Sequence, residues 1–149
     1  MALLAPADQE KLRQAFTEMS QTVRLLFFTQ TIGCDTCLET RQILDELPPL
    51  SDKISIEEVN LVLDQEKAKE YGIDRAPAIA ILRGRNGDGA GPDDSRMRFL
   101  GAPSGYEFMS LVQAILLAGG RASTLTEASK EKLAGVDRPL NLQVFTTPT

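Results

Sequence analysis

The sequence predicts an α/β fold, and two observations carry this prediction. Up to residue 72, segments with helical periodicity alternate with apolar runs of strand length, in the order helix, strand, helix, strand, helix. Further along, two apolar runs flank a loop rich in Gly and Asp over residues 84–95, as in an antiparallel hairpin. The first pattern favours a parallel pair of strands and the second an antiparallel pair, with helices packed against the sheet.

The first part of the chain is expected to contain a helix, a strand and a second helix. Pro6 suits the first turn of a helix over residues 6–19. The strand over 22–29 is almost continuously apolar, as in a central strand covered on both faces. The second helix begins at a pair of cysteines and ends near Leu47, because two prolines follow it. Its expected apolar face consists of Leu38, Ile43, Leu44 and Leu47.

Five further elements complete the expected domain: a strand over 54–63, a polar helix over 64–71, strands over 78–82 and 96–100, and a helix over 104–117. Gly72 is the expected C′ residue of the polar helix, because glycine adopts the left-handed conformation that often ends a helix. Ser104 is the expected N-cap of the last helix.

The motif Cys34-Asp35-Thr36-Cys37 contains the only two cysteines of the chain. A cysteine at a helix N-terminus faces unpaired backbone N–H groups and the positive end of the helix dipole, which favour the thiolate. Cys34 is therefore the expected attacking sulfur, and Cys37 is placed to resolve a mixed disulfide. Asp35 should raise the pKa of Cys34, whereas a hydroxyl hydrogen bond from Thr36 would partly offset that effect.

Metal binding is the main competing interpretation of a Cys-x-x-Cys motif. Zinc takes four ligands, and the chain has no His and no third Cys, so an intramolecular zinc site is not expected. The Gly- and Asp-rich loop lacks the spacing and the terminal Glu of an EF-hand. We therefore expect neither a metal nor another cofactor in the domain.

Composition narrows the class of protein. The 149 residues, with 42% hydrophobic and 25% charged side chains, suit a globular domain with its own core. A net charge of −5 and the lack of a basic cluster argue against nucleic-acid binding. No apolar run is long enough to span a membrane, and the N-terminus does not look like a signal peptide. Two cysteines without such a signal indicate a cytoplasmic location.

Residues 22–118, with the Cys-x-x-Cys at the start of their first helix, resemble the thioredoxin fold, in which helices flank a central mixed four-stranded sheet. The helix over 6–19 is then an extra N-terminal helix. The resemblance implies a cis peptide bond before Pro77, at the start of the third strand. It also implies that Ala76 offers backbone hydrogen bonds to an extended substrate.

A closer resemblance is carried by GIDRAPA at 72–78 and FLGAPSGYEF at 99–108. These stretches look like the N-terminal unit of the glutaredoxin-like protein disulfide oxidoreductases, which consist of two tandem thioredoxin-fold units. Within the chain, EKL at 10–12 recurs at 131–133, and FT at 28–29 recurs at 145–146.

Two expectations for domain organisation follow from these repeats. Residues 1–120 form a thioredoxin-like domain, and residues 121–149 form a linker helix and the first strand of a truncated or degenerate second unit. A lone strand over 140–145 would need a sheet to pair with, so a homodimer contact through this tail is expected.

The leading functional hypothesis is a thiol–disulfide oxidoreductase. The resemblance implies protein disulfides as substrates, a role in cell redox homeostasis, and thioredoxin reductase or glutathione as the electron donor. Two alternatives stay open: a non-catalytic docking module of a tandem redox protein, and a glutathione-dependent iron–sulfur carrier that holds a cluster across a dimer. Thioredoxins also use a buried acid on the strand before the motif, and this strand offers none; Glu57 and Glu58 on the next strand are expected to point to the surface.

Overall fold

The computed structural model describes residues 3–84 and 91–147. Its helices are α1 (Pro6–Phe16), α2 (Cys37–Asp45), the short 3-10 helix η1 (Pro48–Leu50), α3 (Gln65–Glu70), α4 (Tyr106–Ala118) and α5 (Glu127–Ala134). Its strands are β1 (Val23–Thr29), β2 (Ile54–Asn60), β3 (Ala78–Arg83) and β4 (Asp93–Leu100).

The four strands form one mixed sheet in the order β2-β1-β3-β4. β1 is parallel to β2, with Leu26 opposite Glu57, and antiparallel to β3, with Leu26 opposite Ala80. β3 and β4 form an antiparallel pair, in which Ala78 lies opposite Leu100. The predicted parallel pair, hairpin and central apolar strand are all confirmed. Together they are the sheet of the thioredoxin fold.

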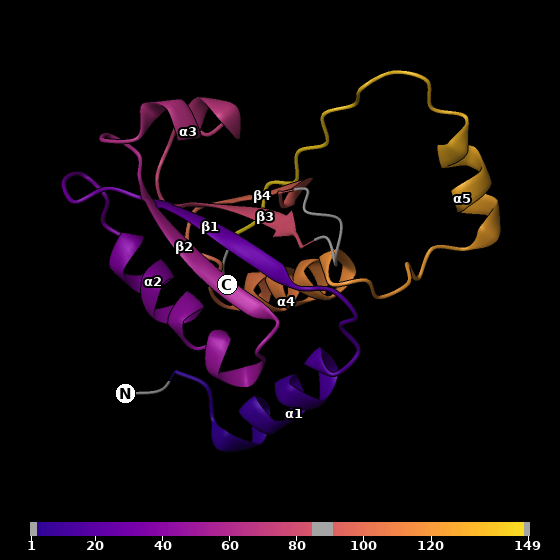
Figure 1. The fold of residues 1–149 in the computed structure, drawn as a ribbon, viewed down its shortest axis with the longest axis horizontal. Coiled ribbons are helices and arrows are strands. Elements are labelled where there is room, and N and C mark those ends of the chain that lie inside the picture. The colour runs from indigo at the N-terminus through magenta and orange to yellow at the C-terminus, as the bar shows by residue number, and fades with distance from the viewer. Residues whose placement is uncertain (1–2, 85–90, 148–149) are drawn as a thin grey trace.

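Helices cover both faces of this sheet (Figure 1). The face toward α1, α2 and α4 buries every second residue of β1, including Leu25 and Phe27. The face toward α3 buries the alternate residues Leu26 and Phe28. β1 has a neighbouring strand on each edge and helices on both faces. Side chains on both of its faces are therefore buried, which accounts for its continuous apolar sequence.

Several sequence expectations need correction at the level of single side chains or ends. α1 ends at Phe16 rather than at residue 19, because the hydroxyl and the N–H of Thr17 both donate to the carbonyl of Gln14. β4 begins at Asp93 rather than at residue 96. Leu38 does not belong to the buried face of α2, because its side chain is 67% exposed. Ser104 does not cap α4, which begins after Gly105 and has no side-chain cap. β2 ends at Asn60 rather than at residue 63, because the side chain of Asn60 accepts hydrogen bonds from the N–H groups of Val62 and Leu63 and turns the chain.

Arg98 forms an ion pair within β4 and a hydrogen bond to the segment that precedes β3. The guanidinium of Arg98 donates to both carboxylate oxygens of Asp94, at 2.8 and 2.7 Å, and to the backbone carbonyl of Tyr71, at 3.1 Å. This hydrogen bonding lowers the pKa of Asp94. Burial raises the pKa of the Tyr71 hydroxyl. The contact holds the chain between α3 and β3 against the sheet.

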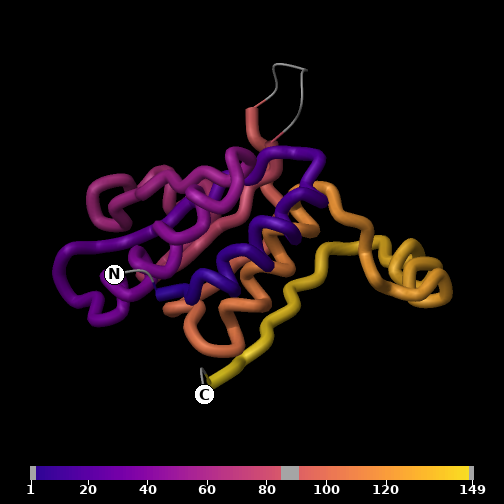
Figure 2. The backbone as a smooth tube through the Cα atoms, turned by 90° about the horizontal axis from the view of Figure 1, so that it is seen from below, coloured from indigo at the N-terminus to yellow at the C-terminus, as the bar shows by residue number. Residues whose placement is uncertain are grey.

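The C-terminal region leaves the domain after α4. Figure 2 shows α5 standing away from the sheet and the tail running back past α4. No residue of α5 is buried, and residues 135–147 contain neither helix nor strand. The expected linker helix is therefore present, whereas the strand expected over 140–145 is not formed. Leu140, Leu142, Val144 and Phe145 are all exposed. Part of the expected hairpin loop, residues 85–90, lies outside the described residues.

Candidate active site

The two cysteines form a disulfide at one edge of the sheet. β1 ends at Thr29, a loop follows, and α2 begins at Cys37, so the motif joins the central strand to the helix. The Cα atoms of Cys34 and Cys37 are 5.5 Å apart. The side-chain amide of Gln30 donates to the carbonyl of Gly33 at 3.2 Å, and Gly33 has a positive φ of 74°. A glycine is thus required where the loop turns into the motif.

The two sulfurs differ in their access to solvent. Cys34 is partly exposed, whereas the exposed fraction of Cys37 is 7%. Asp35 and Thr36 between them are both exposed, and the Thr36 side chain makes no capping hydrogen bond at the start of α2. The oxidised pair therefore presents Cys34 to an incoming molecule and keeps Cys37 behind it.

Thr40, which the sequence analysis did not single out, lies on the inner face of α2 together with Cys37. Its side chain is fully buried, and no other polar or charged side chain is buried among residues 3–84 and 91–147. Its hydroxyl donates to the carbonyl of Thr36 at 2.8 Å, and its backbone N–H donates to the same carbonyl at 3.0 Å. The only available sequence signal was its place three residues after Cys37, which puts both on one helical face.

The segment before β3 lies at the same edge of the sheet. The peptide bond between Ala76 and Pro77 is cis, as expected. β3 starts directly afterwards, with Ala78 opposite Phe28 near the end of β1. Pro77 is buried and Ala76 is partly exposed. The carbonyl of Pro77 accepts a hydrogen bond from the N–H of Gly101 at 2.9 Å, which joins this segment to the loop after β4.

Charged groups around this edge are paired or lie on the surface. Arg75 donates to Asp74 at 2.8 Å, and this hydrogen bond lowers the pKa of Asp74 and raises that of Arg75. Glu57 pairs with Arg24 and Lys67, and Glu58 pairs with Arg41 at 2.8 Å. As expected, the two glutamates of β2 lie at the surface rather than under the disulfide.

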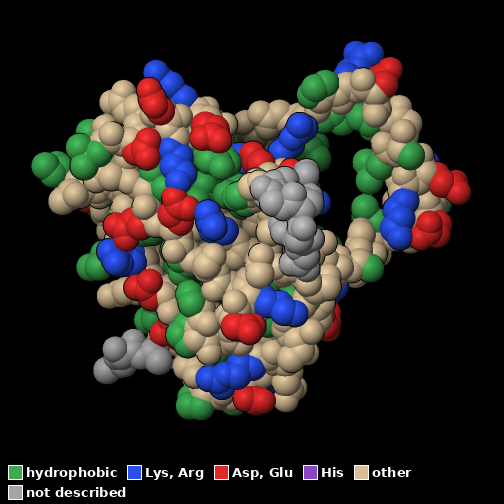
Figure 3. Space-filling view, in the orientation of Figure 1, with side chains coloured by type: hydrophobic (Ala, Val, Ile, Leu, Met, Phe, Trp, Pro, Cys, Tyr) green, Lys and Arg blue, Asp and Glu red, His purple; other side chains and the backbone are tan. Residues whose placement is uncertain are grey.

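Apolar side chains are exposed on the loops that meet at this edge. Ile32 precedes the motif, Leu38 lies in the first turn of α2, Val62 and Leu63 follow β2, and Leu100 ends β4; all five are more than half exposed. Figure 3 shows hydrophobic side chains at the left end of the view, where Figure 1 places the loop between β1 and α2. The disulfide is thus bordered by surface that an apolar chain can cover.

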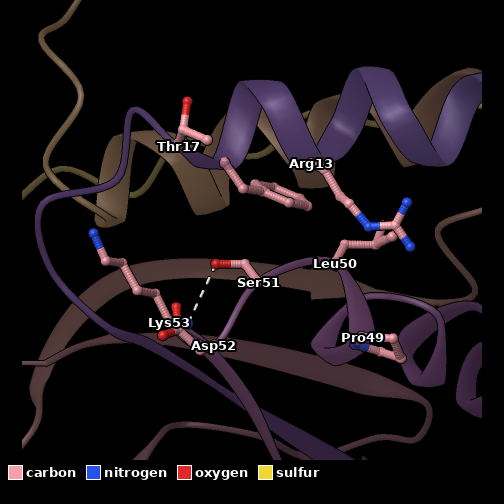
Figure 4. A pocket seen from close by; sticks show the side chains of 8 residues that line it. Arg13, Thr17, Pro49, Leu50, Ser51, Asp52 and Lys53 are labelled. Carbon is pink, nitrogen blue, oxygen red and sulfur yellow. Dashed lines mark hydrogen bonds between the residues drawn. The ribbon is translucent and has the colours of Figure 1, made fainter.

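A hollow of about 510 Å³ lies elsewhere on the molecule (Figure 4). It is lined by Arg13, Phe16 and Thr17 near the end of α1 and by residues 49–53. The backbone N–H of Lys53 donates to the Ser51 hydroxyl there at 3.2 Å. Because η1 follows the C-terminal end of α2, whereas the disulfide lies at its N-terminal end, the hollow is separate from the cysteines.

The described side chains offer neither a metal centre nor a membrane span. Among residues 3–84 and 91–147, no group of three or more His, Cys, Asp or Glu side chains is arranged to hold a metal ion. None of the helices in the described part of the chain has the length and apolar character needed to cross a membrane.

Comparison with known proteins identifies the family. No protein-family model matches the chain. A probable thioredoxin of Methanothermobacter thermautotrophicus is 36% identical over 80 residues, which make up 53% of this chain and 80% of that relative. The chain belongs to the thioredoxin family. The AhpF component of the alkyl hydroperoxide reductase of Escherichia coli is 30% identical over 107 residues, which are 72% of this chain and 17% of that protein.

Solved structures with the thioredoxin fold agree with this assignment. The NTD_N/C domain of the alkylhydroperoxide reductase AhpF from Enterococcus faecalis has a TM-score of 0.74 and 25% identity, over 87% of this chain and 59% of that one. A protein disulfide oxidoreductase from Aeropyrum pernix has a TM-score of 0.72 and 24% identity, over 88% and 54%, and shows the fold alone. The chain thus spans little more than half of either structure. With its Cys34–Cys37 pair, this thioredoxin-family chain is a thiol–disulfide oxidoreductase.

Proposed function

We propose that the protein exchanges disulfides with other proteins through Cys34 as the attacking sulfur and Cys37 as the resolving one. In the reduced protein the Cys34 thiolate attacks a substrate disulfide, which forms a mixed disulfide and releases one substrate thiolate. The Cys37 thiolate then attacks the Cys34 sulfur, which closes the Cys34–Cys37 bond and releases the second substrate thiolate. Two electrons pass to the substrate, whose two sulfurs take up the protons.

The difference in exposure between the two sulfurs carries this assignment. A protein disulfide can reach the partly exposed Cys34, whereas Cys37, with only 7% of its surface exposed, can reach the neighbouring Cys34 sulfur but not a disulfide in another protein. Cys37 is also the first residue of α2, so the unpaired N–H groups of the first helical turn lie beside the pair and favour the thiolate. We infer that Asp35 opposes this effect through its negative charge.

We propose that the segment at Ala76 and Pro77 holds the substrate. It lies at the same edge of the sheet as the motif, and the partly exposed Ala76 stands two residues before Ala78, the first residue of β3. An extended substrate chain that pairs with this backbone would place its side chains over the exposed Ile32 and Leu38.

Trapping with single-cysteine variants tests the roles of the sulfurs. Cys37→Ser should accumulate a mixed disulfide between Cys34 and an oxidised protein substrate, whereas Cys34→Ser should trap none. Mass spectrometry of the non-reduced complexes identifies the linked cysteine. Equal trapping by both variants would contradict the assignment. Reduction of the substrate by the Cys34→Ser variant would do the same.

We propose the electron donors and the cellular location from the same disulfide-exchange chemistry. Because AhpF of Escherichia coli contains a stretch similar to this chain, we infer that the protein exchanges electrons with other redox domains. Thioredoxin reductase and glutathione are the proposed donors, and a glutaredoxin-like role in redox homeostasis of the cytoplasm follows from them. Incubation with thioredoxin reductase and NADPH, or with reduced glutathione alone, followed by counting of the protein's thiols, distinguishes the two.

The C-terminal region is proposed to be the start of a second unit and a contact between two copies of the chain. The internal repeats support the first proposal, with a domain over 1–120 and a second unit from 121 to 149. The exposed Leu140, Leu142 and Val144 support the second, because they alternate with polar residues as in a strand without a partner.

A further inference from the structure

Thr36 and Thr40 form a double hydrogen bond next to the disulfide. The carbonyl of Thr36 accepts from the hydroxyl of Thr40 at 2.8 Å as well as from its backbone N–H at 3.0 Å. This carbonyl belongs to the same peptide group as the N–H of Cys37, because the Thr36–Cys37 bond joins them. A change in the partial charge on the carbonyl oxygen of Thr36 therefore also changes the partial charge on the N–H of Cys37.

The N–H of Cys37 lies at the start of α2, where the thiolate of the reduced protein needs a hydrogen-bond donor. Cys37 is the first residue of α2, so its N–H has no acceptor within the helix. Hydrogen bonds in series polarise one another, so a hydroxyl that donates to a carbonyl makes the N–H of the same peptide more positive. The side chain of Thr36 makes no capping hydrogen bond at this end of the helix. The hydroxyl that polarises the Thr36–Cys37 peptide is therefore that of Thr40.

We propose that Thr40 is a positioning residue of the redox site, which stabilises the Cys34 thiolate through the Thr36–Cys37 peptide. The proposal rests on Cys34 being the attacking sulfur. It also explains why the one buried polar side chain of the described residues lies on the inner face of α2 behind the cysteines. A buried threonine that only satisfied its own hydroxyl would affect the free energy of unfolding and leave the thiolate unchanged.

The pKa of Cys34 in the reduced protein is the decisive measurement. Removal of the hydroxyl in Thr40→Val should raise this pKa by about half a unit, the scale of a helix-terminus interaction. Below the pKa, alkylation of Cys34 by iodoacetamide should then slow about threefold. The midpoint potential should become more negative, because the reduced form loses stabilisation. Thr40→Ser keeps the hydroxyl and should restore both values.

A matched control comes from the end of α1. The Thr17 hydroxyl donates to the carbonyl of Gln14 at 2.6 Å, the same kind of contact far from the cysteines. Thr17→Val should therefore leave the pKa and the potential unchanged. The other charged groups at the redox edge are Asp35, Glu39, Asp64 and the Asp74–Arg75 pair, and all of them are kept in every variant.

The possible results separate the two proposals. A folded Thr40→Val variant with the parent's pKa and potential would overturn the role of Thr40. A parent protein in which iodoacetamide labels Cys37 before Cys34 would instead overturn the assignment of the attacking sulfur. If the valine variant does not fold, Thr40→Ser and Thr40→Ala differ in the hydroxyl alone. A higher pKa in the alanine variant supports the proposal, and equal pKa values overturn it.

Discussion

Asp94 is a residue whose charge should matter to the stability of the fold. Arg98 donates to both of its carboxylate oxygens and lowers its pKa, so the folded state favours the ionised form. The stabilisation is fully present above the ordinary pKa of about 3.9 and is lost as the pH falls through the lowered pKa of the folded state.

We therefore expect Asp94→Asn to lower the free energy of unfolding at pH 7 by about 1 kcal/mol, after allowance for partial exposure to solvent. The difference from the parent should shrink as the pH falls below 4. Urea unfolding at a series of pH values measures it. Asp137→Asn, at an exposed ion pair with Arg138, is the control and should change nothing. A difference that stays constant down to pH 2 would exclude the ion pair as its cause.

At the level of residues, the sequence predicted the redox motif better than it predicted which side chains of α2 point toward the core. The Cys34–Cys37 pair and the cis peptide bond before Pro77 were predictable, because both depend on local motifs. The assignment of Leu38 to the core was wrong, because at about 100° per residue it lies on the opposite side of α2 from Ile43, Leu44 and Leu47. Thr40 lies between these residues on the buried face, and it was missed because only apolar residues were used to define that face.

At the level of elements, the end of α4 packs against the turn that follows α1. The N–H groups of Ser20 and Gln21 donate to the carbonyl of Gly119 at 2.9 and 3.0 Å. A Cβ added at Gly119 would lie 2.8 Å from two side-chain atoms of the buried Met19 and 3.1 Å from the carbonyl of Ile115. There is no room for a methyl group.

Gly119→Ala should therefore lower the free energy of unfolding by about 1–3 kcal/mol, the usual cost of overpacking. Gly135→Ala is a matched control, because Gly135 ends α5 with nearly the same φ and ψ, and its nearest atom would be 3.5 Å away. That variant should be neutral or slightly more stable. Urea unfolding compares the two. Equal effects at both glycines would show that backbone entropy, not packing, is responsible.

Elements were predictable where the periodicity was long, and less so at their ends. β1 and β3 are continuously apolar and α1 has a clear stripe, so their type and order were correct. The limits of α1 and β2 were set by hydrogen bonds that sequence does not reveal, such as those to Asn60. The strand expected over 140–145 has the right alternation but pairs with neither edge strand of the sheet, β2 or β4, and a strand without a partner is not stable.

At the level of the whole molecule, the C-terminal tail should be dispensable for folding. Every residue from Ala122 to Ala128 and from Lys130 to Thr147 is exposed, and no side chain of α5 is buried. A chain that ends at Arg121 should therefore have an unfolding midpoint within about 2 °C of the parent's. Circular dichroism during heating measures both. A loss of more than about 10 °C would mean that the tail contributes to the core.

The same shortened chain tests the proposed contact between two copies. The full chain should have the mass of a dimer in size-exclusion chromatography with light scattering, and the chain ending at Arg121 the mass of a monomer. Val144→Lys in the full chain should weaken the dimer, because a charge cannot be buried in an apolar contact. Equal masses for all three proteins at high concentration would refute the contact.

The central place of β1 also determines how slowly the backbone exchanges its amide hydrogens for deuterium. Leu26 is flanked by β2 and β3 and covered on both faces, so no local opening exposes its amide without disrupting the sheet. Deuterium should enter α5 almost at once and β1 only when the entire domain unfolds. The exchange rate at Leu26 would then report the global free energy of unfolding without any denaturant.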